Sequence, residues 1–126
     1  MNKSVQEMIS RYVSAWNEQD LTSYKVEFEK CWAEDALYLD PYGEYKGVDE
    51  LANFAFKSLE IVPQRKFSIF EEPEYHHGSG RYAWKVEIEG QSNVGYDYFE
   101  YNDNFKITRL VSFFKLPADY PLEKLG

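Results

Sequence analysis

Three polar residues, Tyr12, Asp40 and Asp97, stand where the surrounding pattern of the sequence is apolar. Apolar surroundings disfavour the charged form of a carboxylate and so raise its pKa. A carboxyl group with a raised pKa can stay protonated near neutral pH and donate a hydrogen bond, while a better solvated carboxylate acts as a base. Two aspartates and a phenol in one apolar space could therefore carry acid–base chemistry.

Each of the three residues also has a structural interpretation. Tyr12 could be a core residue whose hydroxyl meets a backbone partner, Asp40 could serve only to form a turn with Pro41, and Asp97 could point to solvent. The residue types by themselves leave these alternatives open. The elements that carry the residues decide whether they converge.

Helical spacing of apolar residues predicts three helices. The first spans about 5–16, contains Tyr12 and begins with a capping box formed by Ser4 and Glu7. The second follows the N-cap Asp20, and its apolar side is predicted to continue through Cys31 and Trp32. The third runs from about 48 to 61. The spacing of the apolar residues in the first helix places Tyr12 on the buried face of that helix.

Beyond residue 63 the apolar period changes to two, which is typical of strands. Strands are predicted around 67–69, at 82–89, at 94–101, which carries Asp97, and at 105–115. A short apolar stretch at 36–39 is stopped by the turn at 40–43, so Asp40 directly follows a buried segment. Helices first and an antiparallel meander afterwards predict an α+β fold with the helices on one face of a curved sheet.

Composition bounds the possible functions. The 126 residues fit a single domain, 1–126, and 23 of them are aromatic, which suits either a core or a ligand pocket. A net charge of −8 without any basic run argues against nucleic acid and anionic membranes as partners. A lone cysteine, Cys31, and the lack of a signal segment or membrane span favour the cytoplasm.

No cofactor or metal is expected. The sequence holds no phosphate-binding glycine loop and no dinucleotide fingerprint. His76 and His77 lack Cys or acidic partners at ligand spacing, and Cys31 lacks an evident base.

Three parts of the sequence carry a resemblance to a known family. They are RYVSAWNEQDL at 11–21, then AEDA at 33–36 with DPYG at 40–43 and KG at 46–47, and finally YDYF at 96–99 with 102–107. They resemble, in this order, the first helix and turn, the next signature and the penultimate hairpin of the SnoaL-like group within the nuclear transport factor 2-like (NTF2-like) superfamily. The resemblance implies a cystatin-like cone, three N-terminal helices on a curved sheet enclosing a pocket, and often a homodimer through the outer sheet face.

Within that superfamily the sequence is similar to ketosteroid isomerase. The resemblance assigns Asp40 as the general base, Tyr12 as the oxyanion-hole tyrosine and Asp97 as the oxyanion-hole acid. Ala55 departs from the pattern, because the isomerases tend to carry a tyrosine there. We expect a small hydrophobic molecule as ligand, contacted by six apolar residues: Trp16, Trp32, Phe54, Trp84, Phe99 and Leu110.

The resulting hypothesis is a cofactor-independent isomerase or cyclase that removes a proton next to a carbonyl group. A first alternative, motivated by Ala55, is a non-catalytic ligand-binding or dimerisation module. A second is a dehydratase or an epoxide hydrolase of the same fold, the latter requiring Arg109 to pair with Asp97.

Overall fold

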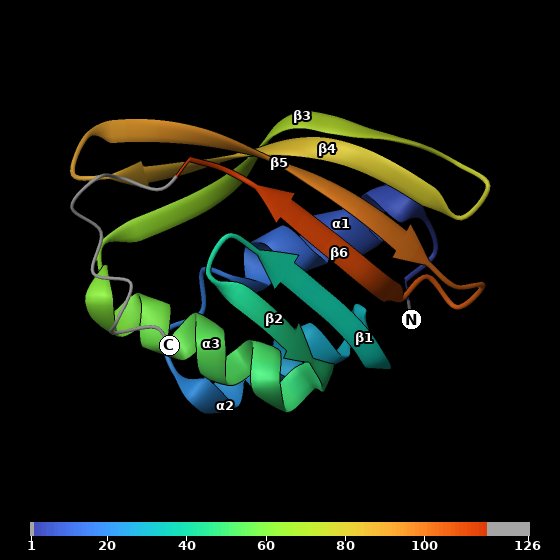
Figure 1. The fold of residues 1–126 in the computed structure, drawn as a ribbon, viewed down its shortest axis with the longest axis horizontal. Helices are drawn as coiled ribbons and strands as arrows, with labels where there is room; N and C mark the ends of the chain where they lie inside the picture. The colour runs from blue at the N-terminus through green and yellow to red at the C-terminus, as the bar shows by residue number, and fades with distance from the viewer. Residues whose placement is uncertain (1, 116–126) are drawn as a thin grey trace.

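The computed structural model describes residues 2–115 and shows three helices and six strands among them (Figure 1). The helices are α1 Val5–Ala15, α2 Leu21–Glu29 and α3 Gly47–Ile61. The predicted caps are present: Ser4 Oγ accepts a hydrogen bond from the Glu7 N–H at 3.1 Å, and Asp20 Oδ1 accepts one from the Ser23 N–H at 2.8 Å. These bonds satisfy N–H groups that lack helical partners.

The strands form one sheet in the order β2-β1-β6-β5-β4-β3. Their bounds are β1 Trp32–Asp40, β2 Gly43–Lys46, β3 Arg65–His76, β4 Ser79–Ile88, β5 Gln91–Tyr101 and β6 Ile107–Phe113. All neighbouring strands are antiparallel except β1 and β6, which run parallel next to the β2 edge of the sheet. The expected meander therefore covers β3 to β6, and the α+β fold is confirmed with one parallel pair added.

Some predicted boundaries differ from the structure. Cys31 follows α2, and Trp32 is the first residue of β1, so the apolar side of α2 does not extend that far. The predicted strand at 67–69 is the inner part of the longer β3, and β2 was not predicted. Because β3 is largely polar towards its end and β2 has only 4 residues, neither offers a long alternating pattern.

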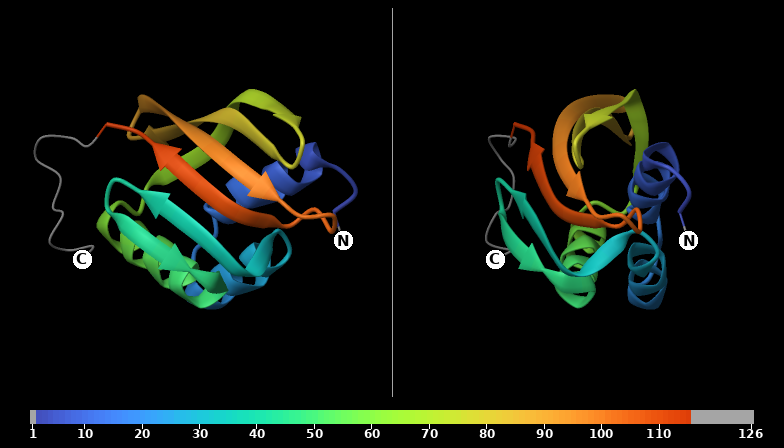
Figure 2. Two further views of the ribbon diagram at one scale, coloured as in Figure 1. Left: turned by 45° about the vertical axis from the view of Figure 1, so that its right-hand side comes forward. Right: turned by 90° about the vertical axis from the view of Figure 1, so that its right-hand side faces the viewer.

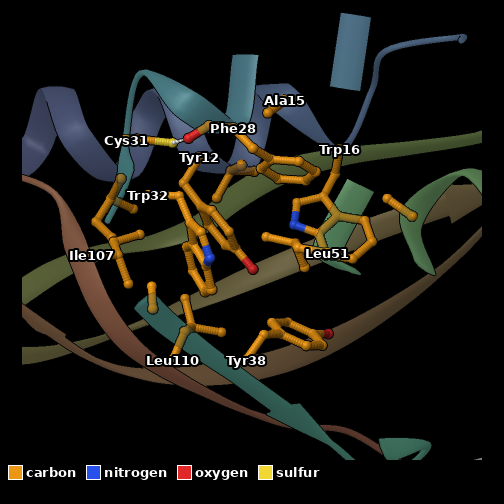
Figure 3. Packing of buried hydrophobic residues seen from close by; sticks show 14 of the residues in the cluster. Tyr12, Ala15, Trp16, Phe28, Cys31, Trp32, Tyr38, Leu51, Ile107 and Leu110 are labelled. Atoms are coloured by element: carbon orange, nitrogen blue, oxygen red, sulfur yellow. Dashed lines mark hydrogen bonds between the residues drawn. The ribbon is translucent and has the colours of Figure 1, made fainter. Parts of the chain in front are cut away.

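The sheet is strongly curved and wraps round an interior that the helices close (Figure 2). Tyr12 lies at the centre of the apolar core: its ring stacks on Trp32 at 5.7 Å, and Trp16 meets it edge-on at 6.4 Å (Figure 3). The Tyr12 side chain points away from α1, towards the strands. Helix α1 therefore carries a phenol into the space under the curved sheet.

Within residues 2–115, no helix has both the length and the apolar character needed to cross a membrane.

Candidate active site

A cavity of about 950 Å³ lies under the curved sheet, between its inner face and helices α1 and α3. Its size is in the range of pockets that hold small organic ligands. Many aromatic side chains reach its wall from the helices, the inner face of the sheet and the ends of strands: Tyr12, Trp16, Tyr38, Tyr42, Phe54, Phe67, Tyr82, Trp84 and Phe114. Asp40 and Asp97 both belong to the same wall. The fold thus brings the three residues Tyr12, Asp40 and Asp97, which are far apart in sequence, to one cavity.

Asp40 ends β1, and its carboxylate is held by the turn that follows. Its Oδ1 accepts hydrogen bonds from the backbone N–H groups of Tyr42 at 2.8 Å and Gly43 at 3.2 Å. Its Oδ2 accepts one from the Tyr38 hydroxyl at 2.7 Å. Burial raises the pKa of Asp40 above its ordinary value, while these three hydrogen bonds act to lower it. The group is a fixed, half-buried carboxylate facing an apolar space.

Asp97 lies on the inner face of β5, and its side chain is only 4% exposed. Its Oδ2 accepts a hydrogen bond from the Tyr82 hydroxyl, and its Oδ1 accepts one from the Trp84 indole N–H at 2.8 Å. Burial raises the pKa of Asp97 to about 6, although hydrogen bonds from Ser112, Tyr82 and Trp84 lower it; the charge of Asp40 raises it further. Asp97 is the more strongly perturbed of the two acids.

Tyr12 is buried, and its pKa is raised well above the ordinary value, first by burial and then by the negative charge of Asp97. A phenol with such a pKa stays protonated and remains a hydrogen-bond donor. Among the hydrogen bonds between described residues none joins Tyr12 to Asp97, whose donors come from β4 and β6 instead. Tyr12 and Asp97 therefore approach the cavity as separate groups.

Tyr38, Tyr82 and Ser112 are polar wall residues that the sequence did not single out. Tyr38 and Tyr82 donate to Asp40 and Asp97 respectively, which makes two phenol–carboxyl pairs facing one cavity. Both tyrosines occupy inward positions of alternating strands, where their rings satisfy the apolar pattern. A tyrosine ring fits the apolar alternation of a strand as a phenylalanine ring does, so the pattern does not reveal the hydroxyl group. The strand register would have found Tyr82 and Ser112, because both lie opposite Asp97 on the neighbouring strands.

The apolar residues expected to contact a ligand divide into two groups. Trp16, Phe54 and Trp84 lie in the cavity wall, and their role in binding remains a prediction. Trp32, Phe99 and Leu110 are a correction, because they lie behind the wall in the core and are at most 1% exposed. These three point inward as expected, but into a part of the core that packed side chains fill.

Arg65, at the start of β3, brings a cation to the cavity wall. It donates to Ser58 Oγ, to Tyr24 Oη at 3.1 Å and to the Ala55 carbonyl at 2.9 Å. Its guanidinium lies 5.9 Å from the centre of the Trp16 ring. Ala55, at the position where the isomerases tend to carry a tyrosine, thus helps to hold Arg65 by accepting a hydrogen bond with its backbone carbonyl.

Arg109 does not pair with Asp97, which corrects the basis of the epoxide-hydrolase alternative. Asp97 lies opposite Ser112 across β5 and β6, whereas Arg109 lies opposite Glu100. Because side chains alternate along a strand, Arg109 points to the other face of the sheet. Arg109 is not part of the cavity wall.

Two further reactive residue types stand apart from the cavity. Burial raises the pKa of the Cys31 thiol to about 12, so it is not an activated nucleophile. His76 and His77 lie at the exposed β3–β4 turn. Within the described part of the chain, no three His, Cys, Asp or Glu side chains gather closely enough to hold a metal ion.

Comparison with solved structures identifies the fold. A SnoaL-like family protein from Agrobacterium tumefaciens str. C58, with a suggested isomerase activity, aligns with a TM-score of 0.79 at 24% identity, covering 86% of this chain and 95% of that one. An NTF2-like protein of unknown function from Cytophaga hutchinsonii ATCC 33406 aligns with a TM-score of 0.67 at 14% identity, over 91% and 93%. A suggested ketosteroid isomerase from Kribbella flavida DSM 17836 gives 0.67 at 15%, over 93% and 82%.

The chain therefore has the α+β cone of the SnoaL-like and NTF2-like proteins. No family model matches its sequence, and no curated protein does. At these identities the likeness defines the fold, and the chemistry has to be argued from the cavity.

Proposed function

We propose that this protein is a cofactor-independent enzyme that moves a proton next to the carbonyl group of a small apolar substrate, as isomerases and cyclases do. One observation carries the proposal: Asp40, Asp97 and the Tyr12 phenol line a single, mostly apolar cavity. The fold neighbours described as isomerases agree with this class of reaction.

In the proposed reaction the Asp40 carboxylate takes a proton from the carbon beside the carbonyl. The electron pair moves onto the carbonyl oxygen, and the resulting enolate oxygen accepts a hydrogen bond from the Tyr12 hydroxyl. Protonated Asp40 then returns the proton to another carbon, which completes an isomerisation. Asp40 suits the base because its fixed carboxylate sits at the partly exposed end of β1. Donors aimed in advance at the developing charge supply much of such a rate enhancement.

Asp97 assists in the same proposal when it is protonated. As a neutral acid it would donate a hydrogen bond of its own, to the enolate oxygen or through the hydroxyl of Tyr82, its present partner. A pKa near 6 makes this form substantial only in mildly acidic solution. The rate is therefore expected to rise as Asp40 ionises and to decline above about pH 6. A β,γ-unsaturated ketone is a suitable probe, since its conjugated product absorbs in the ultraviolet.

A non-catalytic binding module is the second candidate, and the saturation of Asp97 by internal donors favours it. The two candidates differ in how the cavity treats a phenol, which mimics an enolate oxygen. If Tyr12 is an aimed donor, phenols should bind about tenfold tighter than hydrocarbons of equal size, since one hydrogen bond contributes roughly 1.5 kcal/mol. Tyr12→Phe should remove that preference and leave hydrocarbon binding unchanged. Equal binding of both ligand types to the wild type would favour the module.

We further propose that the protein is a homodimer that pairs through the outer face of β5 and β6. The support is a set of exposed aromatic side chains there: Tyr96 and Phe113 are neighbours across β5 and β6 and are 56% and 58% exposed, and Tyr98 is 38% exposed.

Tyr98→Glu is expected to convert a dimer into a monomer in sedimentation equilibrium, because it introduces charge into the proposed interface. The matched control is Val26→Glu, since Val26 is an exposed apolar residue on α2 at 48% exposure. A wild-type protein that sediments as a monomer would refute the dimer.

A further inference from the structure

Gly95 on β5 lies directly beneath the indole of Trp84. The two residues face each other across the β4–β5 pair. A Cβ atom built on Gly95 would be 2.1 Å from Trp84 Cζ2, 2.4 Å from Cε2 and 2.7 Å from Cη2. These atoms belong to the rigid ring system of the indole. Residue 95 therefore cannot carry a methyl group while the indole keeps its present position.

The backbone of Gly95 gives no other reason for a glycine. The positive-φ glycines of the described chain are Gly47, Gly78 and Gly90, and Gly95 is not among them. A glycine inside a strand weakens the strand unless another group approaches closely. The close approach here is the Trp84 ring.

Trp84 connects this packing to the candidate site. Its indole N–H donates to Asp97 Oδ1 at 2.8 Å, and its ring lies in the cavity wall against the edge of Phe67 at 5.7 Å. Asp97 is two residues beyond Gly95 on the same face of β5. The space above Gly95 therefore sets where the indole lies and, through it, where the N–H meets the carboxyl group.

We propose that Gly95 is a positioning residue for the candidate site: the missing side chain lets the Trp84 indole lie against β5 and hold the Asp97 carboxyl at the cavity. The inference deepens the proposed function, because it concerns the acid assigned there as a donor. Its test needs no turnover, however, so it can fail or succeed independently of the proposed reaction.

Titration of the Asp97 carboxyl by carbon-13 NMR tests the proposal. The Trp84 N–H favours the ionised carboxylate, so losing it should raise the measured pKa of Asp97. Gly95→Ala and Trp84→Phe are each expected to raise that pKa by about one, the size of one hydrogen bond to a charged group. Combining them should add little, because both remove the same contact.

Gly80→Ala is the matched control. A Cβ on Gly80 would be 2.5 Å from Phe99 Cζ, so it is equally crowded, but Gly80 lies outside the cavity wall. It should lower stability and leave the Asp97 titration unchanged. An unchanged titration in Gly95→Ala, or an equal change in Gly80→Ala, would overturn the proposal.

A second measurement tests the proposal if the Gly95→Ala variant does not fold. Two of the three clashing atoms, Cζ2 and Cη2, lie farther from the backbone of residue 84 than a phenylalanine ring extends, and one of them makes the shortest contact. If Gly95→Ala does not fold, Gly95→Ala with Trp84→Phe should fold about as stably as Trp84→Phe alone. Failure of this rescue would show that the glycine is needed for another reason.

Discussion

Asp40→Asn is expected to lower kcat/KM for a β,γ-unsaturated ketone by a factor of about 10² to 10⁴, the usual contribution of a positioned acid–base group. Asparagine can still accept hydrogen bonds from the turn N–H groups of Tyr42 and Gly43, so the cavity should keep its shape. The loss should therefore fall on kcat, with KM nearly unchanged. Ultraviolet absorbance of the conjugated product follows the reaction.

Asp35→Asn is the matched control for this experiment. Asp35 lies on the same strand, β1, but is exposed and outside the cavity wall. Its replacement removes one negative charge from β1 without touching the site, and the rate should stay within twofold of wild type. If Asp40→Asn were as active as Asp35→Asn, Asp40 would not be the base.

The three candidate residues could be singled out in the sequence because each breaks or ends an apolar pattern, and the resemblance to ketosteroid isomerase predicted that they share one site. Tyr12 sits in the buried stripe of α1, and Asp40 follows a buried segment and precedes a proline. Asp97 occupies an inward position of β5, in line with Gly95 and Phe99. A polar group at a position of this kind must either find partners or line a cavity, and here Asp40 and Asp97 do both.

The depth of each residue within the cone could not be read from the sequence. Periodicity tells which side of a strand faces inward, but not whether that point is at the open cavity or at the packed end. Trp32 and Trp84 illustrate the limit: both are inward tryptophans, yet Trp32 stacks on Tyr12 in the core and Trp84 lines the cavity. Their places depend on the parallel β1–β6 contact and on the opening above Gly95, which are set by distant parts of the chain.

The pKa of Asp97 makes folding stability depend on pH between about 4 and 6. An exposed aspartate has an ordinary pKa of 3.8, and burial raises that of Asp97 to about 6. The folded chain thus binds this proton more tightly than the unfolded chain. The corresponding stability is fully present below pH 3.8 and is lost as pH rises through 6. Two pKa units correspond to about 3 kcal/mol.

Asp97→Asn should abolish this loss, because asparagine does not titrate and can accept from the Trp84 N–H while donating to the Tyr82 hydroxyl. The free energy of unfolding of Asp97→Asn, relative to wild type, is therefore expected to grow by about 2.5 kcal/mol from pH 4 to pH 7. Urea unfolding at several pH values measures this difference, and groups that titrate equally in both proteins cancel. A constant difference between Asp97→Asn and wild type over this range would mean that the folded protein keeps Asp97 ionised down to its ordinary pKa, which would remove the neutral acid from the proposed site.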